Sequence, residues 1–303
     1  MINLDVLVIG GGPAGLSAAG QLVRAGLRTM VFERGRPGGL LWNANWVENY
    51  PGFPGGIAGP ELASLFRDQA LTLGVRIEAR SVHRLRLSGN GYFLAEVDRS
   101  SVRAGAAIVA SGTRPILARW PGCAAMLGRR AFTEIADVEP EEMKGRRALI
   151  VGGGDAAFDY ALRWLGKGGE AEILIRSKPI SLALLAERAR AGGIPVFIGS
   201  RPLRVTPTLK GICLQYIQGK TIRHREADVL LLALGREPDL SGLSPSLRPL
   251  LRKRSVEILP PGLFGAGDVI QGRYRQTGIA VGDGLRAALA AIDYLKGAGD
   301  GNS

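Results

Sequence analysis

Two segments of the chain share the same order of a short apolar strand, a glycine-rich turn and a helical pattern. In the first, residues 4–9 (LDVLVI) lead into GGGPAG, which contains Gly10, Gly12 and Gly15. The first glycine of such a turn permits the tight bend, the second lets a pyrophosphate approach the backbone, and the third lets helix and strand pack closely. Free N–H groups at the helix start then bind the phosphate charge. The segment therefore predicts a dinucleotide site, which also includes Pro13 and Ala14.

The acidic residue after the next strand restricts which dinucleotide this site accepts. A second strand pattern, residues 28–32, ends at Glu33, and Arg34 follows it. A carboxylate at this position can accept hydrogen bonds from both hydroxyls of an adenosine ribose, and it disfavours a 2′-phosphate. The first site is therefore suited to FAD or NAD, with Glu33 and Arg34 beside the adenosine.

The second copy differs from the first at this same position. Residues 148–151 (ALIV) precede GGGDAAFD, and a helix pattern and a strand at 171–175 follow. That strand ends in IRSKP, so cations stand where the first copy has an acid. Cations there can pair with a 2′-phosphate, which favours NADPH over NADH; the less favoured alternative is that they are ordinary surface residues after a strand. The residues of this second site are Gly152, Gly154, Asp155, Ala156, Ala157, Arg176 and Lys178. The role of Asp159, in the helix, is left open.

Composition restricts the class of protein more than its reaction. A chain of 303 residues, 46% of them hydrophobic, is long enough for two globular domains. The two cysteines, Cys123 and Cys213, provide neither a disulfide framework nor metal-ligand spacing, so we expect buried thiols and no metal. A formal net charge of +12 favours an acidic partner. The arginines are spread along the chain with few aromatic neighbours, which argues against nucleic acid. The absence of a long apolar stretch and of a signal-peptide pattern predicts a cytoplasmic protein without membrane contact.

Four further segments resemble the low-molecular-weight thioredoxin reductase family. They are GGLLWNANWVENYPG (38–52), IVASGTRP (108–115), LLALGREP (231–238) and LFGAGDVIQGRYRQTGIAVGDGLRA (263–287). The resemblance spans nearly the whole chain and implies bound FAD, bound NADPH and a homodimer. By this resemblance, the residues beside the flavin and its phosphates are Gly39, Leu40, Asn49, Ala110, Ser111, Gly112, Gly267, Asp268, Arg275, Gln276 and Thr277. Trp42 and Trp46 either shield the flavin or belong to an ordinary core.

The order of these segments predicts the domain organisation. The fold class is α/β, with two Rossmann-like, doubly wound, three-layer dinucleotide-binding domains, the second inserted in the first. We assign residues 1–115 and 246–303 to FAD and residues 116–245 to NAD(P)H. The crossings near 113–118 and 237–244 contain glycine and proline, and they are candidate hinges.

One feature of the family is missing from this sequence. In thioredoxin reductases a CxxC motif precedes the second fingerprint, and the matching positions here are Ile135, Ala136, Asp137 and Val138. Disulfide exchange needs a vicinal thiol pair, so this activity is not expected. No protein side chain is then a catalytic residue, because the flavin carries the chemistry.

Electrons must leave the flavin by another route. Ferredoxin (or flavodoxin)–NADP reductases of the thioredoxin reductase type also lack the CxxC, and their small carriers are usually acidic, which suits the positive charge. Such enzymes generally carry a C-terminal aromatic extension, whereas this sequence has no aromatic residue beyond Tyr294. The alternatives are a flavoenzyme that acts on a quinone, oxygen or a natural product, and a flavin-binding redox module with impaired NADPH use.

Overall fold

The chain folds into two compact units. The computed structural model describes residues 2–253, 255–258 and 260–300. Unit 1 comprises Met1–Trp42, Val47–Arg114 and Glu237–Ser303, and unit 2 comprises Asn43–Trp46 and Pro115–Arg236. The two main crossing segments, β9 (Thr113–Pro115) and β18 (Arg236–Pro238), pair as a two-stranded sheet. The return crossing therefore lies at residue 237 and not at 246, and residues 237–245 cluster with the first unit.

A mainly parallel sheet with the strand order β19-β20-β8-β1-β2-β5 forms the centre of unit 1. Its middle strand, β1 (Ile2–Ile9), buries four consecutive residues, Val6 to Ile9, because a central parallel strand is covered on both faces. In the register, Val8 lies between Val31 and Ile108. The other strands are β2 (Thr29–Phe32), β5 (Arg76–Glu78), β8 (Ser100–Val109), β19 (Glu257–Ile258) and β20 (Leu263–Gly265).

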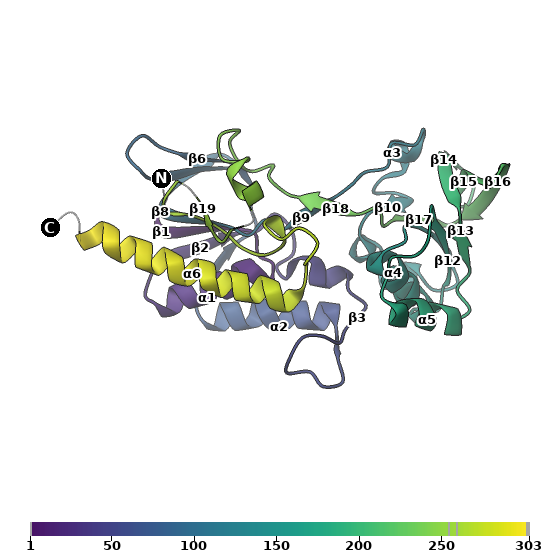
Figure 1. Ribbon diagram of the computed structural model, residues 1–303, viewed down its shortest axis with the longest axis horizontal. Helices are drawn as coiled ribbons and strands as arrows, with labels where there is room; N and C mark the ends of the chain where they lie inside the picture. Colours follow the sequence, from purple (N-terminus) through teal and green to yellow (C-terminus); the bar gives the residue numbers. More distant parts are fainter. Residues whose placement is uncertain (1, 254, 259, 301–303) are drawn as a thin grey trace. The chain divides into compact units, whose positions relative to one another are not determined.

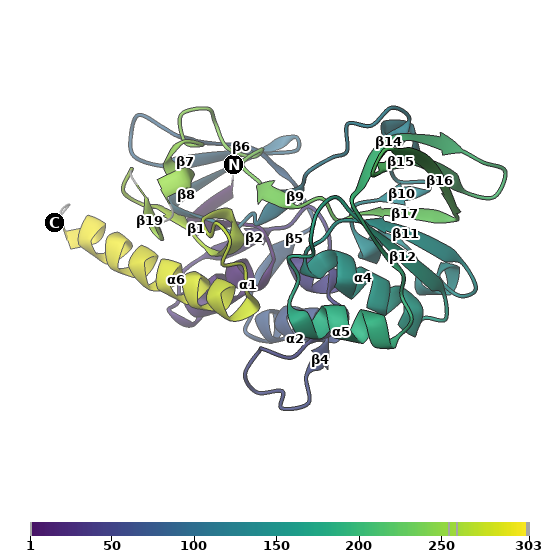
Figure 2. The ribbon, with the colours of Figure 1, turned by 45° about the vertical axis from the view of Figure 1, so that its right-hand side comes forward.

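Helices cover one face of this sheet and a β-hairpin covers the other. Figures 1 and 2 show α1 (Pro13–Arg24), α2 (Gly59–Thr72) and α6 (Thr277–Asp300) on the same side of the sheet. The hairpin of β6 (Val82–Leu87) and β7 (Phe93–Val97) continues antiparallel from β8. Helices α1 and α6 pack closely, since a Cβ atom on Gly284 would lie 2.2 Å from the carbonyl oxygen of Ala14. Short elements complete the unit: η1 (Gly39–Asn43), β3 (Trp46–Val47), β4 (Ile57–Ala58), η4 (Leu250–Lys253) and η5 (Gly267–Val269).

Unit 2 repeats the arrangement around a smaller parallel sheet of order β10-β17-β11-β12-β13. Its strands are β10 (Ala131–Phe132), β11 (Arg147–Val151), β12 (Glu170–Ile175), β13 (Val196–Ile198) and β17 (Val229–Leu232). Helices α4 (Asp155–Gly166) and α5 (Ala183–Ala191) pack on one face around the buried Trp164. The antiparallel sheet of β14 (Ser200–Pro207), β15 (Ile212–Gln218) and β16 (Thr221–Ala227) packs on the other, around Tyr216. Figure 2 shows these three layers.

The predicted fold class is confirmed. Both units contain a parallel sheet between a helical layer and an antiparallel β layer, and unit 2 interrupts unit 1 in sequence. Among the described residues, no helix is long and apolar enough to cross a membrane.

Candidate cofactor-binding site

The first glycine-rich turn joins β1 to α1 and contains two glycines that the packing requires. Gly10 has a φ of +100°, and a Cβ atom on it would lie 2.3 Å from the carbonyl oxygen of Ala110. A Cβ atom on Gly15 would lie 1.9 Å from the carbonyl oxygen of Gly10. No side chain larger than hydrogen fits either position without displacing the backbone.

Gly12 is different, because its surroundings are open. It is the N-cap of α1 in an extended conformation, and the nearest atom to a Cβ built on it is Gly39 Cα at 3.8 Å. Pro13 and Ala14 form the first turn of the helix behind it. Space at the helix N-terminus, where backbone N–H groups lack partners, is what a pyrophosphate needs. Gly39, the first residue of η1, is this nearest neighbour, and Leu40 follows it in the same turn.

Glu33 lies at the end of β2 and faces the turn. Its Oε2 accepts a hydrogen bond of 2.6 Å from Gly11 N, and its Oε1 accepts one of 2.7 Å from Gly35 N. These two main-chain donors hold the carboxylate at the carboxyl edge of the sheet. The position fits the ribose of a dinucleotide whose pyrophosphate lies at Gly12.

Asp239 bonds to the residues that follow β8, and no sequence motif predicted this role. Arg34 forms an ion pair of 2.8 Å with the buried Asp239 carboxylate. Ser111 Oγ donates to the main-chain oxygen of Asp239 at 2.7 Å, and Asp239 N donates to the carbonyl oxygen of Gly112 at 3.0 Å. Burial acts to raise the pKa of Asp239, but hydrogen bonds from Ser241 and the Arg34 guanidinium outweigh burial and lower the pKa. The Asp239 carboxylate thus stays ionised and holds Arg34, while the main-chain groups of Asp239 hold Ser111 and Gly112.

The last predicted group lies around the start of α6. Gln276 and Asn49, which are 227 residues apart in sequence, form a 2.7 Å hydrogen bond from Asn49 Nδ2 to Gln276 Oε1. Asp268 lies in η5 after Gly267, and the buried Asp283 carboxylate accepts from Gly267 N at 3.3 Å and from Gln271 Nε2 at 2.8 Å. Asp283 therefore ties α6 to the loop that carries Asp268, a role that no motif predicted. Arg275 and Thr277 flank Gln276 at the N-terminus of the 24-residue helix.

The second glycine-rich turn, in unit 2, likewise has one glycine where packing leaves no room for a Cβ atom and one where the space is open. A Cβ atom on Gly152 would lie 2.3 Å from the carbonyl oxygen of Ala233, whereas one on Gly154 would meet nothing within 4 Å. Ala157 is fully buried, and Asp155 and Ala156 form the exposed first turn of α4. Gly154 thus leaves open space at the start of α4, as Gly12 does at the start of α1.

The loop after β12 folds back onto this turn. Ile180 N donates to the carbonyl oxygen of Gly153 at 2.8 Å, and Leu182 N donates to Asp155 Oδ1 at 2.7 Å. Between β12 and these anchors, Arg176 and Lys178 are exposed. The structure therefore places both cations on a loop that is hydrogen-bonded to the predicted phosphate site.

Two of the four positions that match the CxxC motif, Ile135 and Val138, form part of an apolar core. Ile135, Ala136 and Asp137 make the 3-10 turn η2, and Val138 follows it. Ile135 is fully buried and Val138 nearly so, and both pack in the same cluster as Trp164. Both cysteines are free; burial raises the pKa of the thiols of Cys123 and Cys213. The prediction of buried thiols is therefore confirmed for Cys123, whereas Cys213 is only half-buried. Within the described residues, no group of three or more His, Cys, Asp or Glu side chains could hold a metal ion.

A polar cluster in unit 2 surrounds Glu134, the residue directly before η2. Glu134 accepts hydrogen bonds from Asn43 Nδ2 at 2.7 Å and from Tyr160 Oη at 3.4 Å, and it forms an ion pair with Arg236. Asn43 Oδ1 in turn accepts from Ala136 N at 3.1 Å. Burial, together with the charge of Glu134, raises the pKa of Tyr160. The sequence predicted none of these partners, because Asn43 lies 91 residues from Glu134.

Asp159 on α4, whose role the sequence left open, is hydrogen-bonded to the segment Asn43–Trp46, which also contains the Glu134 partner Asn43. Its Oδ2 accepts a 2.7 Å hydrogen bond from Asn45 N. Burial raises the pKa of Asp159 to about 6, against the opposing effects of this hydrogen bond and of Arg163.

The two tryptophans near this segment differ in their surroundings. Trp42 Nε1 donates to the carbonyl oxygen of Pro37 at 2.8 Å, while Trp46 is 47% exposed.

Comparisons with known proteins agree with this geometry. Residues 4–284 match the family described as pyridine nucleotide-disulphide oxidoreductase. A bifunctional thioredoxin reductase/thioredoxin of Mycobacterium leprae (strain TN) is 31% identical over 306 residues, which cover 96% of this chain and 66% of that protein. NADPH-dependent thioredoxin reductase 3 of Arabidopsis thaliana is 32% identical over 308 residues, covering 96% of this chain and 58% of that protein. The chain thus spans less than two thirds of the length of these relatives. The crystal structure of Lactococcus lactis thioredoxin reductase superposes with a TM-score of 0.88 at 27% identity, covering 96% of this chain and 99% of that one.

Proposed function

The chain belongs to the pyridine nucleotide-disulphide oxidoreductase family, and within it we propose that this thioredoxin reductase-like flavoprotein transfers electrons from NADPH to an acidic one-electron carrier such as ferredoxin or flavodoxin. The observation that supports this proposal most strongly is the turn at residues 135–138. The helix starts at Gly12 and Gly154 are open, as two phosphate sites require, but Ile135 and Val138, at the positions of the family's two redox cysteines, are buried in an apolar core. The acceptor is then a partner that takes electrons from the flavin directly.

FAD would be held by unit 1. When bound, it accepts a hydride from NADPH and passes the electrons on. The pyrophosphate would bind at Gly12 and the N-terminus of α1, and the ribose would bind at Glu33. The positive end of α6 at Thr277 would favour negative charge on the flavin ring. The Asn49–Gln276 hydrogen bond would fix the Gln276 amide at that end.

NADPH would be held by unit 2. Its pyrophosphate would bind at Gly154, at the start of α4, and Arg176 and Lys178 would pair with the 2′-phosphate. Because the loop that carries both cations is anchored to Gly153 and Asp155, they would be held close to the phosphate site before the cofactor binds. Such preorganisation reduces the entropy lost on binding.

The charge of the chain supports an acidic acceptor. A net charge of +12 accelerates encounter with a negatively charged protein, and added salt screens this attraction. As the family resemblance implies, we propose a homodimer, which sedimentation of the purified protein would test.

Stopped-flow and steady-state measurements test the proposal in two steps. Mixing FAD-loaded protein with NADPH under anaerobic conditions should bleach the visible absorption band of the flavin, and an unbleached band would refute the use of NADPH. The reduced protein should then reduce ferredoxin or flavodoxin but not thioredoxin. Reduction of thioredoxin, or turnover only with a quinone or oxygen, would refute the proposed acceptor.

A further inference from the structure

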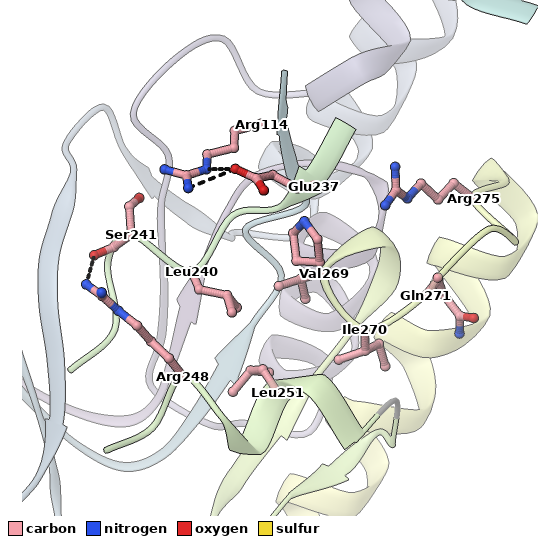
Figure 3. A pocket seen from close by; sticks show the side chains of 12 residues that line it. Arg114, Glu237, Leu240, Ser241, Arg248, Leu251, Val269, Ile270, Gln271 and Arg275 are labelled. Atoms are coloured by element: carbon pink, nitrogen blue, oxygen red, sulfur yellow. Dashed lines mark hydrogen bonds and ion pairs between the residues drawn. The ribbon is translucent and has the colours of Figure 1, made fainter. Parts of the chain in front are cut away.

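A pocket of about 690 Å³ lies entirely within unit 1, beside the start of α6. This volume is within the range of pockets that hold small organic ligands, roughly 300–1,000 Å³. Figure 3 shows the apolar side chains of Leu240, Leu251, Val269 and Ile270 in the middle of the pocket wall. Leu251, Val269 and Ile270 are buried, so they form a fixed apolar floor.

The rim of the pocket is cationic. Arg114, Arg248 and Arg275 line it together with one carboxylate, Glu237, so the titratable side chains of the lining carry a charge of +2. Figure 3 shows these charged side chains around the apolar group, with Arg114 and Glu237 joined. An apolar floor with a positive rim is complementary to a molecule that has an apolar body and an anionic end.

Arg248 is held in a way that keeps its charge available. Its Nε donates to the carbonyl oxygen of Leu243 at 2.8 Å, and its Nη2 donates to that of Ser241 at 3.3 Å. Both acceptors are main-chain carbonyl groups, which orient the guanidinium but do not neutralise its charge. The side chain is therefore preorganised, and it is exposed to an incoming anion.

Arg114 is a second cation that an anion can recruit at little cost. Its Nη2 lies 2.9 Å from Glu237 Oε1, and both side chains are more than half exposed. Exposed ion pairs of this kind contribute only about 0–1 kcal/mol. A ligand carboxylate can therefore share or replace the Glu237 contact without a large penalty.

We propose that this pocket binds a small organic anion, with its apolar body on Leu240, Leu251 and Ile270 and its carboxylate or sulfonate group against Arg248 and Arg114. The site goes beyond the proposed electron transfer and does not depend on the identity of the carrier. Of the residues assigned to the dinucleotides, only Arg275 also lines the pocket. We infer that the ligand and FAD bind at the same time.

Calorimetric titration of the FAD-loaded full-length protein with 2-naphthoate tests this site, and 2-naphthamide is the neutral control. We expect saturable 1:1 binding of the carboxylate and at least about tenfold weaker binding of the amide, because only the anion forms charge-assisted hydrogen bonds. Arg248→Gln and Arg114→Gln should each weaken naphthoate binding by about tenfold. Arg76→Gln, an exposed arginine on β5 at the opposite edge of the same sheet, should leave it unchanged.

Four results would overturn the proposal. They are the absence of saturable binding, equal affinity for the acid and the amide, an Arg248→Gln variant that binds like Arg76→Gln, and binding to the apoprotein but not to the FAD-loaded protein. The last result would show that the pocket is part of the flavin cavity. Flavin content and circular dichroism of each variant separate loss of the ligand site from loss of the fold.

Discussion

Replacement of Gly12 by alanine should separate the folding of unit 1 from its binding of FAD. Gly12 has φ −76° and ψ −177°, which an alanine adopts without strain, and the added Cβ would be 3.8 Å from its nearest neighbour. The fold should therefore lose at most about 1 kcal/mol, the difference between glycine and alanine at a helix N-cap. In the complex, however, the methyl group would occupy the space through which the pyrophosphate approaches the backbone.

The loss of FAD affinity can be estimated from the contacts at risk. If the methyl group displaces the phosphates from two backbone N–H groups, each hydrogen bond to the charged group contributes about 1.5–3 kcal/mol, or about 3–6 kcal/mol together. Since about 1.4 kcal/mol corresponds to a factor of ten, the Kd of FAD should rise at least about a hundredfold. Fluorescence titration of the apoprotein measures this change, and urea unfolding of the apoprotein measures the stability.

Two matched variants complete the experiment. Gly154→Ala, at the equally open position in unit 2, should leave FAD affinity unchanged. Gly15→Ala should instead destabilise the apoprotein by about 1–3 kcal/mol or more, because its Cβ would overlap the carbonyl oxygen of Gly10. If Gly12→Ala binds FAD with wild-type affinity, the phosphates do not approach at Gly12 and the reasoning is wrong.

Three further predictions concern unit 2 and the acceptor. Replacing both Arg176 and Lys178 by alanine should raise the KM for NADPH at least about tenfold more than that for NADH, and equal effects would show that the pair does not read the 2′-phosphate. Because the pKa of Asp159 is raised to about 6 from its usual 3.8, its contribution to stability is present below pH 4 and is lost as the pH rises through 6. Asp159→Asn should remove this pH dependence of the free energy of unfolding, at most about 3 kcal/mol, as measured by urea unfolding at several pH values. An unchanged pH profile would contradict the raised pKa of Asp159. Reduction of ferredoxin should fall steeply between low and high salt, and a rate independent of ionic strength would argue against an acidic carrier.

The sequence was sufficient for features that depend on neighbouring residues. The turns at Gly10 and Gly152 are signalled by glycine spacing directly after an apolar strand, so both strands could be placed within one or two residues. The missing thiol pair at residues 135–138 was equally evident, because the absence of sulfur needs no coordinates. From these local patterns the α/β class and the inserted second domain were predicted, and both are confirmed.

The tertiary structure decided which distant side chains meet. Asp239 with Arg34, Asn49 with Gln276, and Asn43 with Glu134 are pairs far apart along the chain, and no spacing rule connects them. The point at which the chain returns to unit 1, residue 237, likewise follows from packing and not from the motif that signalled it. The glycine-rich turns are signalled by residues a few positions apart, so the sequence by itself predicted where phosphates could bind. The polar partners and the cationic pocket depend on the path of the whole chain, and only the folded structure brings them together.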